Sequence, residues 1–190
     1  MATHEPAQVL VPLAEGFEEI EAVTIIDVLR RAGVRVFVAG LARGPVRGAH
    51  GITLATDGSL DEVDVAGLAM LVLPGGMPGT LNLKQDPRVL ELVRTLEGSG
   101  RTVAAICAAP TVLAAAGVLA GRRVTSYPGV RNQLAGAEVV DAPRVVRSGR
   151  VVTSQGVGTA LDFALELVAE LSGPAVAQEQ RRAMLVASQP

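Results

Sequence analysis

Short apolar runs alternate along this chain with longer segments in which apolar residues recur every three or four positions. The runs predict buried β-strands, because a strand that is apolar throughout is covered on both faces. They lie at residues 8–13, 34–41, 68–73 and 103–106, and a further pair at 145–147 and 151–154 flanks the turn residues Ser148-Gly149, which predicts a hairpin. Strands covered on both faces are typical of a mostly parallel sheet packed between helices, so the pattern predicts an α/β fold.

The segments with helical periodicity predict helices at residues 18–31, 87–96, 110–116 and 159–171, and a C-terminal helix at 175–187 after Gly173-Pro174. In the first helix, five apolar residues approximate one broad face: Ile20, Val23, Ile25, Ile26 and Leu29. Residues 45–56, with two glycines, predict a short hairpin or an irregular excursion. Residues 123–127 predict a strand that is broken by Pro128 and followed by a short helical piece at 130–134.

Composition limits the organisation of the chain and its compartment. With 190 residues, of which 49% are hydrophobic, the simplest expectation is a single domain over residues 1–190 with a real core. One cysteine excludes an intramolecular disulfide, which suits a reducing cytosol. The first eight residues lack a basic segment, and the apolar run after them is too short for a signal peptide or a membrane span. We therefore expect a cytoplasmic protein without a membrane partner.

Charge and residue types argue against several classes of ligand. The net charge is −2, no long basic run occurs, and 2% of the residues are aromatic, so neither a phosphate-tracking stripe nor a base-stacking surface is indicated. Nucleic acid is therefore not expected as a primary ligand. No cluster of Cys and His predicts a metal site. Gly156-Val157-Gly158 lacks the remaining spacing of a dinucleotide loop, so no cofactor is assigned.

Cys107, the single cysteine, follows an apolar run and precedes Pro110, which opens a helical pattern. A thiol between a strand and a helix lies near the positive end of the helix dipole and near unpaired N–H groups, and both favour the thiolate. At an ordinary pKa of about 8.5 only about 3% would be thiolate at pH 7, whereas a pKa near 5.5 would make nearly all of it reactive. The alternative interpretation is a small, inert core side chain.

The first predicted helix supplies carboxylates that could act with this thiol. Glu18 and Glu19 fall in its first turn, where the favoured interpretation is solvated acids that stabilise the dipole. Glu21 lies beside the apolar face, so its side chain could point inward. A carboxyl group held in a dry site beside a thiolate has a raised pKa and donates a hydrogen bond at neutral pH. The loops after three predicted strands, at 14–21, 74–79 and 107–110, can converge on one site, because parallel strands end at one edge of the sheet.

Several runs in order along essentially the whole chain resemble the ThiJ/PfpI superfamily, and most closely the branch that holds bacterial YajL and the human Parkinson-disease deglycase. The runs are Leu13-Ala14-Glu15-Gly16-Phe17-Glu18-Glu19-Ile20-Glu21, Asp27-Val28-Leu29-Arg30-Arg31-Ala32-Gly33, Leu73-Pro74-Gly75-Gly76, Ala104-Ala105-Ile106-Cys107-Ala108-Ala109-Pro110 and Thr153-Ser154-Gln155-Gly156-Val157-Gly158-Thr159. The resemblance implies a flavodoxin-like sandwich, similar to class I glutamine amidotransferases, and a homodimer.

The resemblance also implies roles for individual residues. Cys107 would be the nucleophile and Glu21 its protonated partner, while the backbones of Gly75, Gly76 and Ala108 would form an anion pocket around the sulfur. Two positions depart from patterns in the wider family. Many members have a histidine where this chain has Tyr127 before Pro128, and protease-like members have a histidine where it has Ala108. A Cys-His pair is therefore missing at both positions, and peptidase activity is the least expected function.

Two histidines occur, His4 and His50. His4 lies in the N-terminal tail and is assigned no role. His50 lies in the excursion where relatives place a residue near the partner subunit's site, and it is interpreted as a surface-loop histidine in preference to a catalytic one. Tyr127, Pro128 and His50 are the residues that could line the pocket.

The resemblance implies a cofactor-free enzyme that acts on methylglyoxal, glyoxal or their early adducts with protein groups. The alternative is an oxidative-stress sensor or holdase chaperone that works through oxidation of Cys107.

Overall fold

The computed structural model describes residues 8–187, and its centre is a seven-stranded sheet with the order β10-β11-β7-β6-β1-β2-β5. The strands are β1 (Gln8–Leu13), β2 (Arg35–Gly40), β5 (Gly58–Ser59), β6 (Leu68–Leu73), β7 (Thr102–Ile106), β10 (Val145–Ser148) and β11 (Val151–Ser154). All neighbouring strands run parallel except β10, which pairs antiparallel with β11 across the turn at Ser148-Gly149. The predicted α/β fold with a mostly parallel sheet is confirmed.

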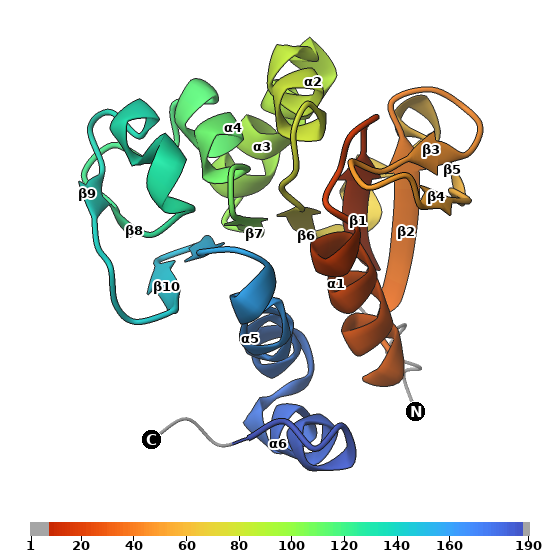
Figure 1. Cartoon of the computed structure of the whole chain (residues 1–190), viewed down its shortest axis with the longest axis vertical. Helices are drawn as coiled ribbons and strands as arrows, with labels where there is room; N and C mark the ends of the chain where they lie inside the picture. Colours follow the sequence, from red (N-terminus) through yellow and green to blue (C-terminus); the bar gives the residue numbers. More distant parts are fainter. Residues whose placement is uncertain (1–7, 188–190) are drawn as a thin grey trace.

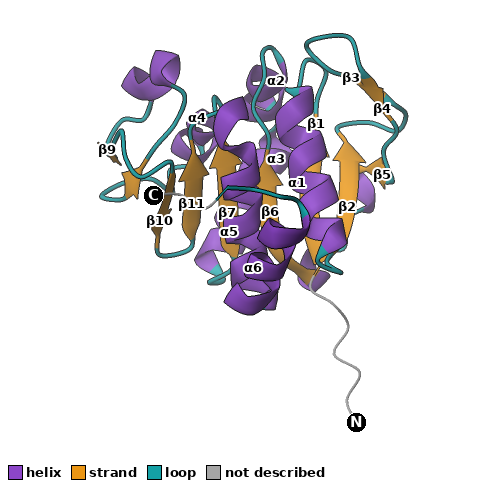
Figure 2. Ribbon diagram, turned by 60° about the horizontal axis from the view of Figure 1, so that its bottom comes forward, coloured by secondary structure: helices purple, strands orange, loops and turns teal. Residues whose placement is uncertain are grey.

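Helices cover both faces of the sheet (Figures 1 and 2). On one face lie α1 (Glu19–Arg31), α5 (Ala160–Ser172) and α6 (Pro174–Ala183), with α5 packed between the other two. On the other face lie α2 (Gly79–Gln85), α3 (Pro87–Gly98) and α4 (Pro110–Ala115). The result is a three-layer sandwich of the flavodoxin-like type.

Two hydrophobic cores lie on the two sides of the sheet. Each central strand contributes side chains to both, because its successive side chains alternate between the two faces. In β7, Ala104 and Ile106 join the core under α1 and α5, while Val103 and Ala105 join the core under α3 and α4. Successive side chains of a strand point to opposite faces, so a strand between two helical layers has to be apolar at every position. This is why the central strands have no polar alternation.

Several elements differ from the sequence-based expectations. Helix α2 was not predicted, because its glycine start and its Asn82, Lys84 and Gln85 give it no clear apolar face. The predicted strand at 123–127 is reduced to β8 (Arg123–Val124), which pairs with β9 (Glu138–Val139) outside the main sheet. The C-terminal helix α6 covers residues 174–183 in place of 175–187.

The hairpin expected within residues 45–56 is present as β3 (Val46–Arg47) and β4 (Thr53–Leu54). Short 3₁₀ turns fill the remaining connections at Leu60–Glu62, Val65–Gly67, Pro128–Gln133 and Val157–Thr159.

The first helix does not bury the whole apolar face that its sequence suggested. Ile25 and Leu29 are fully buried, but Ile20 and Val23 are 58% and 44% exposed. Within residues 8–187, no helix combines the length and apolar character needed to span a bilayer.

Candidate active site

Cys107 lies between β7 and α4 in a strained backbone conformation. Its φ is +62°, in the left-handed region that residues with a side chain rarely adopt. Two backbone hydrogen bonds hold it there: the Cys107 N–H donates to the Ser154 carbonyl (3.0 Å), and the Tyr127 N–H donates to the Cys107 carbonyl (2.8 Å). This elbow turns the thiol away from the strand direction and toward the carboxyl edge of the sheet.

Glu21 lies in the first turn of α1 and is fully buried. The Gly75 N–H donates to Glu21 Oε2 (2.8 Å), and Glu18 caps the helix by accepting from the Glu21 N–H (2.7 Å). Glu21 Oε1 is also buried, and no N–H or O–H donor from residues 8–187 bonds it. The Cys107 thiol interacts with this carboxyl group, so acid and sulfur form one pair.

The backbone N–H groups of Gly76 and Ala108 both face the Cys107 sulfur and favour its ionised form. The family resemblance also implied that Gly75 belongs to this anion pocket, but its N–H donates to Glu21. Gly75 therefore holds the acid in place, while Gly76 and Ala108 face the sulfur.

Both groups of the pair have raised pKa values. Burial raises the pKa of Glu21 to about 7, against the lowering effect of its hydrogen bonds from Gly75 and Cys107. Burial, followed by the negative charge of Glu21, raises the pKa of Cys107 to about 12. The pair thus shares one proton over the range between these values, and the proton belongs to the two groups together.

This result corrects the expectation that the thiol alone would have a low pKa. Helix α4 spans six residues, too few for a large dipole, and the two amides only partly offset burial and the Glu21 charge. The pKa of Glu21 is raised, in the direction that was predicted. Thiolate character therefore requires the shared proton to lie on Glu21.

Glycines allow the backbone to approach this pair closely. A Cβ atom on Gly75 would lie 2.7 Å from Cys107 Cβ and 2.7 Å from Glu21 Oε2. A Cβ atom on Gly156 would lie 4.0 Å from both Cys107 Sγ and Glu21 Oε1. Gly156 therefore forms one wall of the site, which the sequence analysis missed. Its position two residues after a buried strand was the available signal, because such loops meet at the same sheet edge.

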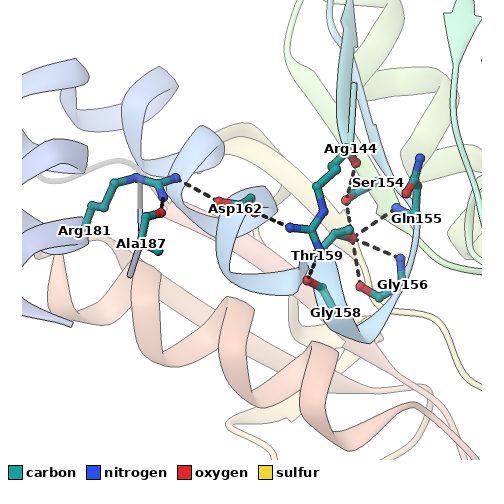
Figure 3. Close-up of polar contacts among 9 residues, drawn as sticks. All are labelled: Arg144, Ser154, Gln155, Gly156, Gly158, Thr159, Asp162, Arg181 and Ala187. Carbon is teal, nitrogen blue, oxygen red and sulfur yellow. Dashed lines mark hydrogen bonds and ion pairs between the residues drawn. The ribbon is translucent and has the colours of Figure 1, made fainter. Parts of the chain in front are cut away.

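The loop that carries Gly156 is held by the side chain of Thr159 (Figure 3). Thr159 Oγ1 accepts from the N–H groups of Gln155 (3.2 Å) and Gly156 (3.1 Å) and shares a 2.7 Å hydrogen bond with Ser154 Oγ. The same hydroxyl also lies 2.8 Å from the Gly156 carbonyl. This buried cluster fixes the wall opposite Cys107.

Outside that cluster, an ionic chain leads from the loop to the C-terminal helix (Figure 3). Arg144 donates to the Gly158 carbonyl (2.6 Å) and pairs with Asp162 (3.5 Å), and Asp162 accepts from Arg181 of α6 (2.9 Å). Arg181 in turn donates to the Ala187 carbonyl (2.9 Å). These contacts link Ala187, the last described residue, to α5, the helix that follows the loop.

His50 lies on the hairpin that covers the start of α1 and is bonded to Glu19. Its Nδ1 lies 2.9 Å from Glu19 Oε2, and its backbone N–H donates to Glu19 Oε1 (2.7 Å). This hydrogen bond and the charge of Glu19 raise the pKa of the exposed His50 ring. Within this chain His50 is therefore a hydrogen-bond partner of Glu19. Among residues 8–187, no hydrogen bond joins His50 to Cys107 or Glu21.

Glu18 and Glu19 are buried, at 8% and 4% exposure, so the expectation of solvated acids is wrong. Glu18 caps Glu21, and Glu19 fastens the hairpin through the N–H groups of His50 and Ile52. Glu18, Glu19 and His50 place three ligand atoms within 4.8 Å of one another, so together they could hold a cation. The hydrogen bonds from the hairpin to Glu19 already explain why these side chains lie together, because they join the hairpin to α1.

Tyr127 and Pro128 lie beside the elbow but are exposed, with Tyr127 at 53%. A Cβ atom on Gly156 would lie 3.9 Å from the Tyr127 ring, which places the ring beside that wall of the site. Neither Tyr127 nor Ala108 supplies an imidazole base. His4 lies outside the described residues.

The chain is similar to known proteins over most of its length. Residues 7–170 match the model of the DJ-1/PfpI family. The chain is 44% identical over 180 residues to protein dj-1beta of Drosophila melanogaster, covering 94% of this chain and 96% of that one. The crystal structure of the same fly protein superposes with a TM-score of 0.93 at 42% identity, covering 96% and 100% of the two chains.

A further relative has a name that states an activity. Glutathione-independent glyoxalase DJR-1.2 of Caenorhabditis elegans is 41% identical over 176 residues, covering 92% of each chain.

The tight contact at Gly75 predicts that a single methyl group destabilises the site. In Gly75→Ala the added Cβ meets Cys107 and Glu21 at less than contact distance, so we expect a loss of roughly 1–3 kcal/mol in the free energy of unfolding. Gly98→Ala is the matched control, because a Cβ there meets nothing within 4 Å and alanine favours the helix by about 1 kcal/mol. Urea denaturation measures both; equal stability of the two variants would contradict the packing argument.

The raised pKa of Glu21 predicts a pH-dependent stability difference. As the pH rises from about 4.5 to about 7, Glu21 loses its proton in the unfolded chain before it does in the folded one, so its contribution to stability declines. Glu21→Gln does not titrate, and relative to wild type it should gain up to about 3 kcal/mol across this window. Urea titrations at pH 4.5 and pH 8 measure the change, with Glu138→Gln as an exposed control. A difference that stays constant with pH would refute it.

Proposed function

The chain belongs to the DJ-1/PfpI family, and from that premise we propose that it is a cofactor-independent glyoxalase or deglycase. Its substrates would be methylglyoxal, glyoxal or their early adducts with amino and thiol groups. The observation that carries the proposal is the pairing of Cys107, at a strained elbow, with a fully buried Glu21 that shares its proton. The name of the nematode relative supports the same class of reaction.

In the first step, the Cys107 thiolate attacks the aldehyde carbon of methylglyoxal. The carbon–oxygen π bond opens, and the proton held by Glu21 passes to the new alkoxide, which gives a hemithioacetal. The N–H groups of Gly76 and Ala108, which face the sulfur, lie where they can stabilise the developing negative charge. Glu21 is left as a carboxylate, ready to act as a base.

In the second step, Glu21 removes the proton from the former aldehyde carbon and returns it to the neighbouring ketone carbon, while the hydroxyl proton of the hemithioacetal passes to the former ketone oxygen. This transfer converts the hemithioacetal into a thioester of a 2-hydroxy acid. Water then cleaves the thioester, releasing lactate and the Cys107 thiol. The overall change adds one water to methylglyoxal, so no external oxidant or reductant is consumed. A group whose pKa lies near 7 suits both transfers, because it donates and accepts at similar cost.

The second candidate is an oxidative-stress sensor or holdase chaperone. The amides of Gly76 and Ala108 and a protonated Glu21 could also hold a sulfinate formed on Cys107. With a single cysteine in the chain, no intramolecular disulfide can return a sulfenic acid to the thiol, which opposes a peroxidase cycle. Peptidase activity is the third candidate and the weakest, because Ala108 stands where protease-like members have a histidine and Tyr127 stands where many family members have one. Each of these roles needs a reduced thiol at the start, which suits the cytoplasm.

Lactate formation from methylglyoxal by metal-free protein tests the leading proposal. Wild type should turn over in buffer without added thiols, and Cys107→Ala should show none. Glu21→Gln keeps the size and one donor but cannot accept a proton, so we expect a loss of at least about 100-fold in kcat/KM. Full activity in Glu21→Gln would contradict the proposed acid–base role of Glu21. No turnover above Cys107→Ala would favour the redox candidate, which intact mass after peroxide treatment then tests.

We also propose that the protein is a homodimer formed through α1. Ile20, Val23 and Ile52 are 58%, 44% and 56% exposed, and the Ile52 N–H bonds Glu19, which places Ile52 beside the start of the helix. These three side chains, the α1 patch, leave apolar surface exposed at the hairpin that carries His50. A second copy that covers this patch would bring His50 toward its partner.

A charge in the α1 patch should weaken the dimer. Val23→Glu places a carboxylate in the proposed contact, where it would lose hydration, so we expect the dissociation constant to rise at least about tenfold. Leu185→Glu is the control, because Leu185 is 91% exposed and follows α6, which bonds α1 at Arg31, the end of the helix opposite the α1 patch. Sedimentation velocity across a dilution series measures both variants; a wild type that is monomeric throughout would reject the dimer.

A further inference from the structure

A small pocket lies next to Ala108, the residue after the reactive cysteine, on the side of α2 and α4. Its volume is about 50 Å³, and its lining includes Met77, Thr80, Lys84, Ala108, Thr111 and Gln133. These residues come from the loop after β6, from α2, from the elbow and α4, and from the 3₁₀ turn at Pro128–Gln133. The pocket is small: one water molecule in the liquid occupies about 30 Å³, so only a small group fits.

The pocket begins directly beyond the two amides that face the sulfur. Met77 follows Gly76 and Ala108 follows Cys107, and consecutive Cα atoms lie about 3.8 Å apart. A ligand whose electrophilic carbon sits on Cys107 therefore needs only a few further bonds to reach it.

Thr80 gives the pocket an unused hydrogen-bonding group. The residue is 2% exposed, and its Oγ1 is buried without a partner from any residue in 8–187. Thr111, on the facing helix, differs, because its hydroxyl donates to the Ala108 carbonyl (2.8 Å). A buried hydroxyl without a partner costs about 1–3 kcal/mol, so a ligand that accepts from Thr80 would recover that cost.

Lys84 gives the same pocket a positive charge. It is the only lysine in the chain, and it is partly buried. No acidic side chain of the described part forms an ion pair with it, whereas Arg88, further along the chain, pairs with both Asp61 and Asp86. Its ammonium is thus available to an anionic ligand group.

We propose that this pocket is a subsite for a carboxylate, bound by Lys84 and by the hydroxyl of Thr80. A carboxylate accepts from both donors at once, and it is small enough for the space. A neutral group would leave the Lys84 charge unused, and a phosphate has two more oxygens to place.

The proposal deepens the proposed function, on which its choice of substrate rests. A free dicarbonyl has no carboxylate for the subsite. An adduct of a dicarbonyl with a free amino acid or a short peptide carries a carboxylate a few bonds from the reacting carbon. The subsite therefore favours low-molecular-weight adducts with a free carboxylate over methylglyoxal itself.

Alkylation of Cys107 by a matched pair of reagents tests the subsite without turnover. N-(iodoacetyl)glycine carries a carboxylate a few bonds from its reactive carbon, and N-(iodoacetyl)glycinamide is its neutral analogue. The ratio of their second-order rate constants, followed by intact mass at about 0.15 M salt, reports carboxylate selectivity. The variants are Lys84→Met, which keeps chain length, and Thr80→Val, which keeps shape. Arg182→Met removes one positive charge on α6, on the opposite face of the sheet.

We expect the wild-type ratio to favour the carboxylate reagent, and each subsite variant to lower it by roughly threefold to tenfold while the rate of the amide reagent stays unchanged. Arg182→Met should keep the wild-type ratio. A ratio that is equal in wild type, Lys84→Met and Thr80→Val would overturn the proposal, as would an equal fall in Arg182→Met. If the protein labels selectively with the carboxylate reagent but makes no lactate, the proposed glyoxalase activity is rejected. The carboxylate subsite is then still supported.

Discussion

The site depends on one close approach between two stretches of backbone, the loop after β6 and the turn before α1. The Glu18 N–H donates to the Gly75 carbonyl (2.9 Å), and the Gly79 N–H donates to the Gly16 carbonyl (3.1 Å). A Cβ atom on Gly76 would lie 2.2 Å from the Glu18 nitrogen, so no other residue fits there without movement. This contact fixes the start of α1 against β6 and therefore sets where Glu21 meets Cys107.

Two unfavourable features are concentrated at that meeting point. Cys107 adopts a positive φ, and Glu21 is fully buried with one oxygen that has no N–H or O–H donor among the described residues. Each costs free energy in the folded state. The surrounding apolar strands and the buried hydroxyl cluster around Thr159 supply the rigidity that maintains them. Such a local conflict with folding rules is typical of a functional site.

Much of this arrangement could be predicted because it depends on local signals. Apolar runs between turn residues located β1, β6 and β7 within a residue or two, because a strand that is covered on both faces is apolar at nearly every position. The single cysteine after such a run located the elbow. The loops that follow three strands were expected to converge, and hydrogen bonds from Gly75 to Glu21 and from Glu18 to Gly75 join two of them.

The parts that were missed depend on contacts between distant segments. The burial of Glu19 arises because a hairpin about 30 residues away donates two N–H groups to it, which no helical periodicity can indicate. The pKa of Cys107 was misjudged for the same kind of reason: the first turn of a helix suggests a low pKa, but burial of the thiol and then the charge of Glu21, 86 positions earlier in the chain, raise it. A short helix contributes little against burial of the thiol and a carboxylate in contact with it, so these two effects together determine the direction. The reactivity of the sulfur is therefore a property of the pair, set by where one proton lies.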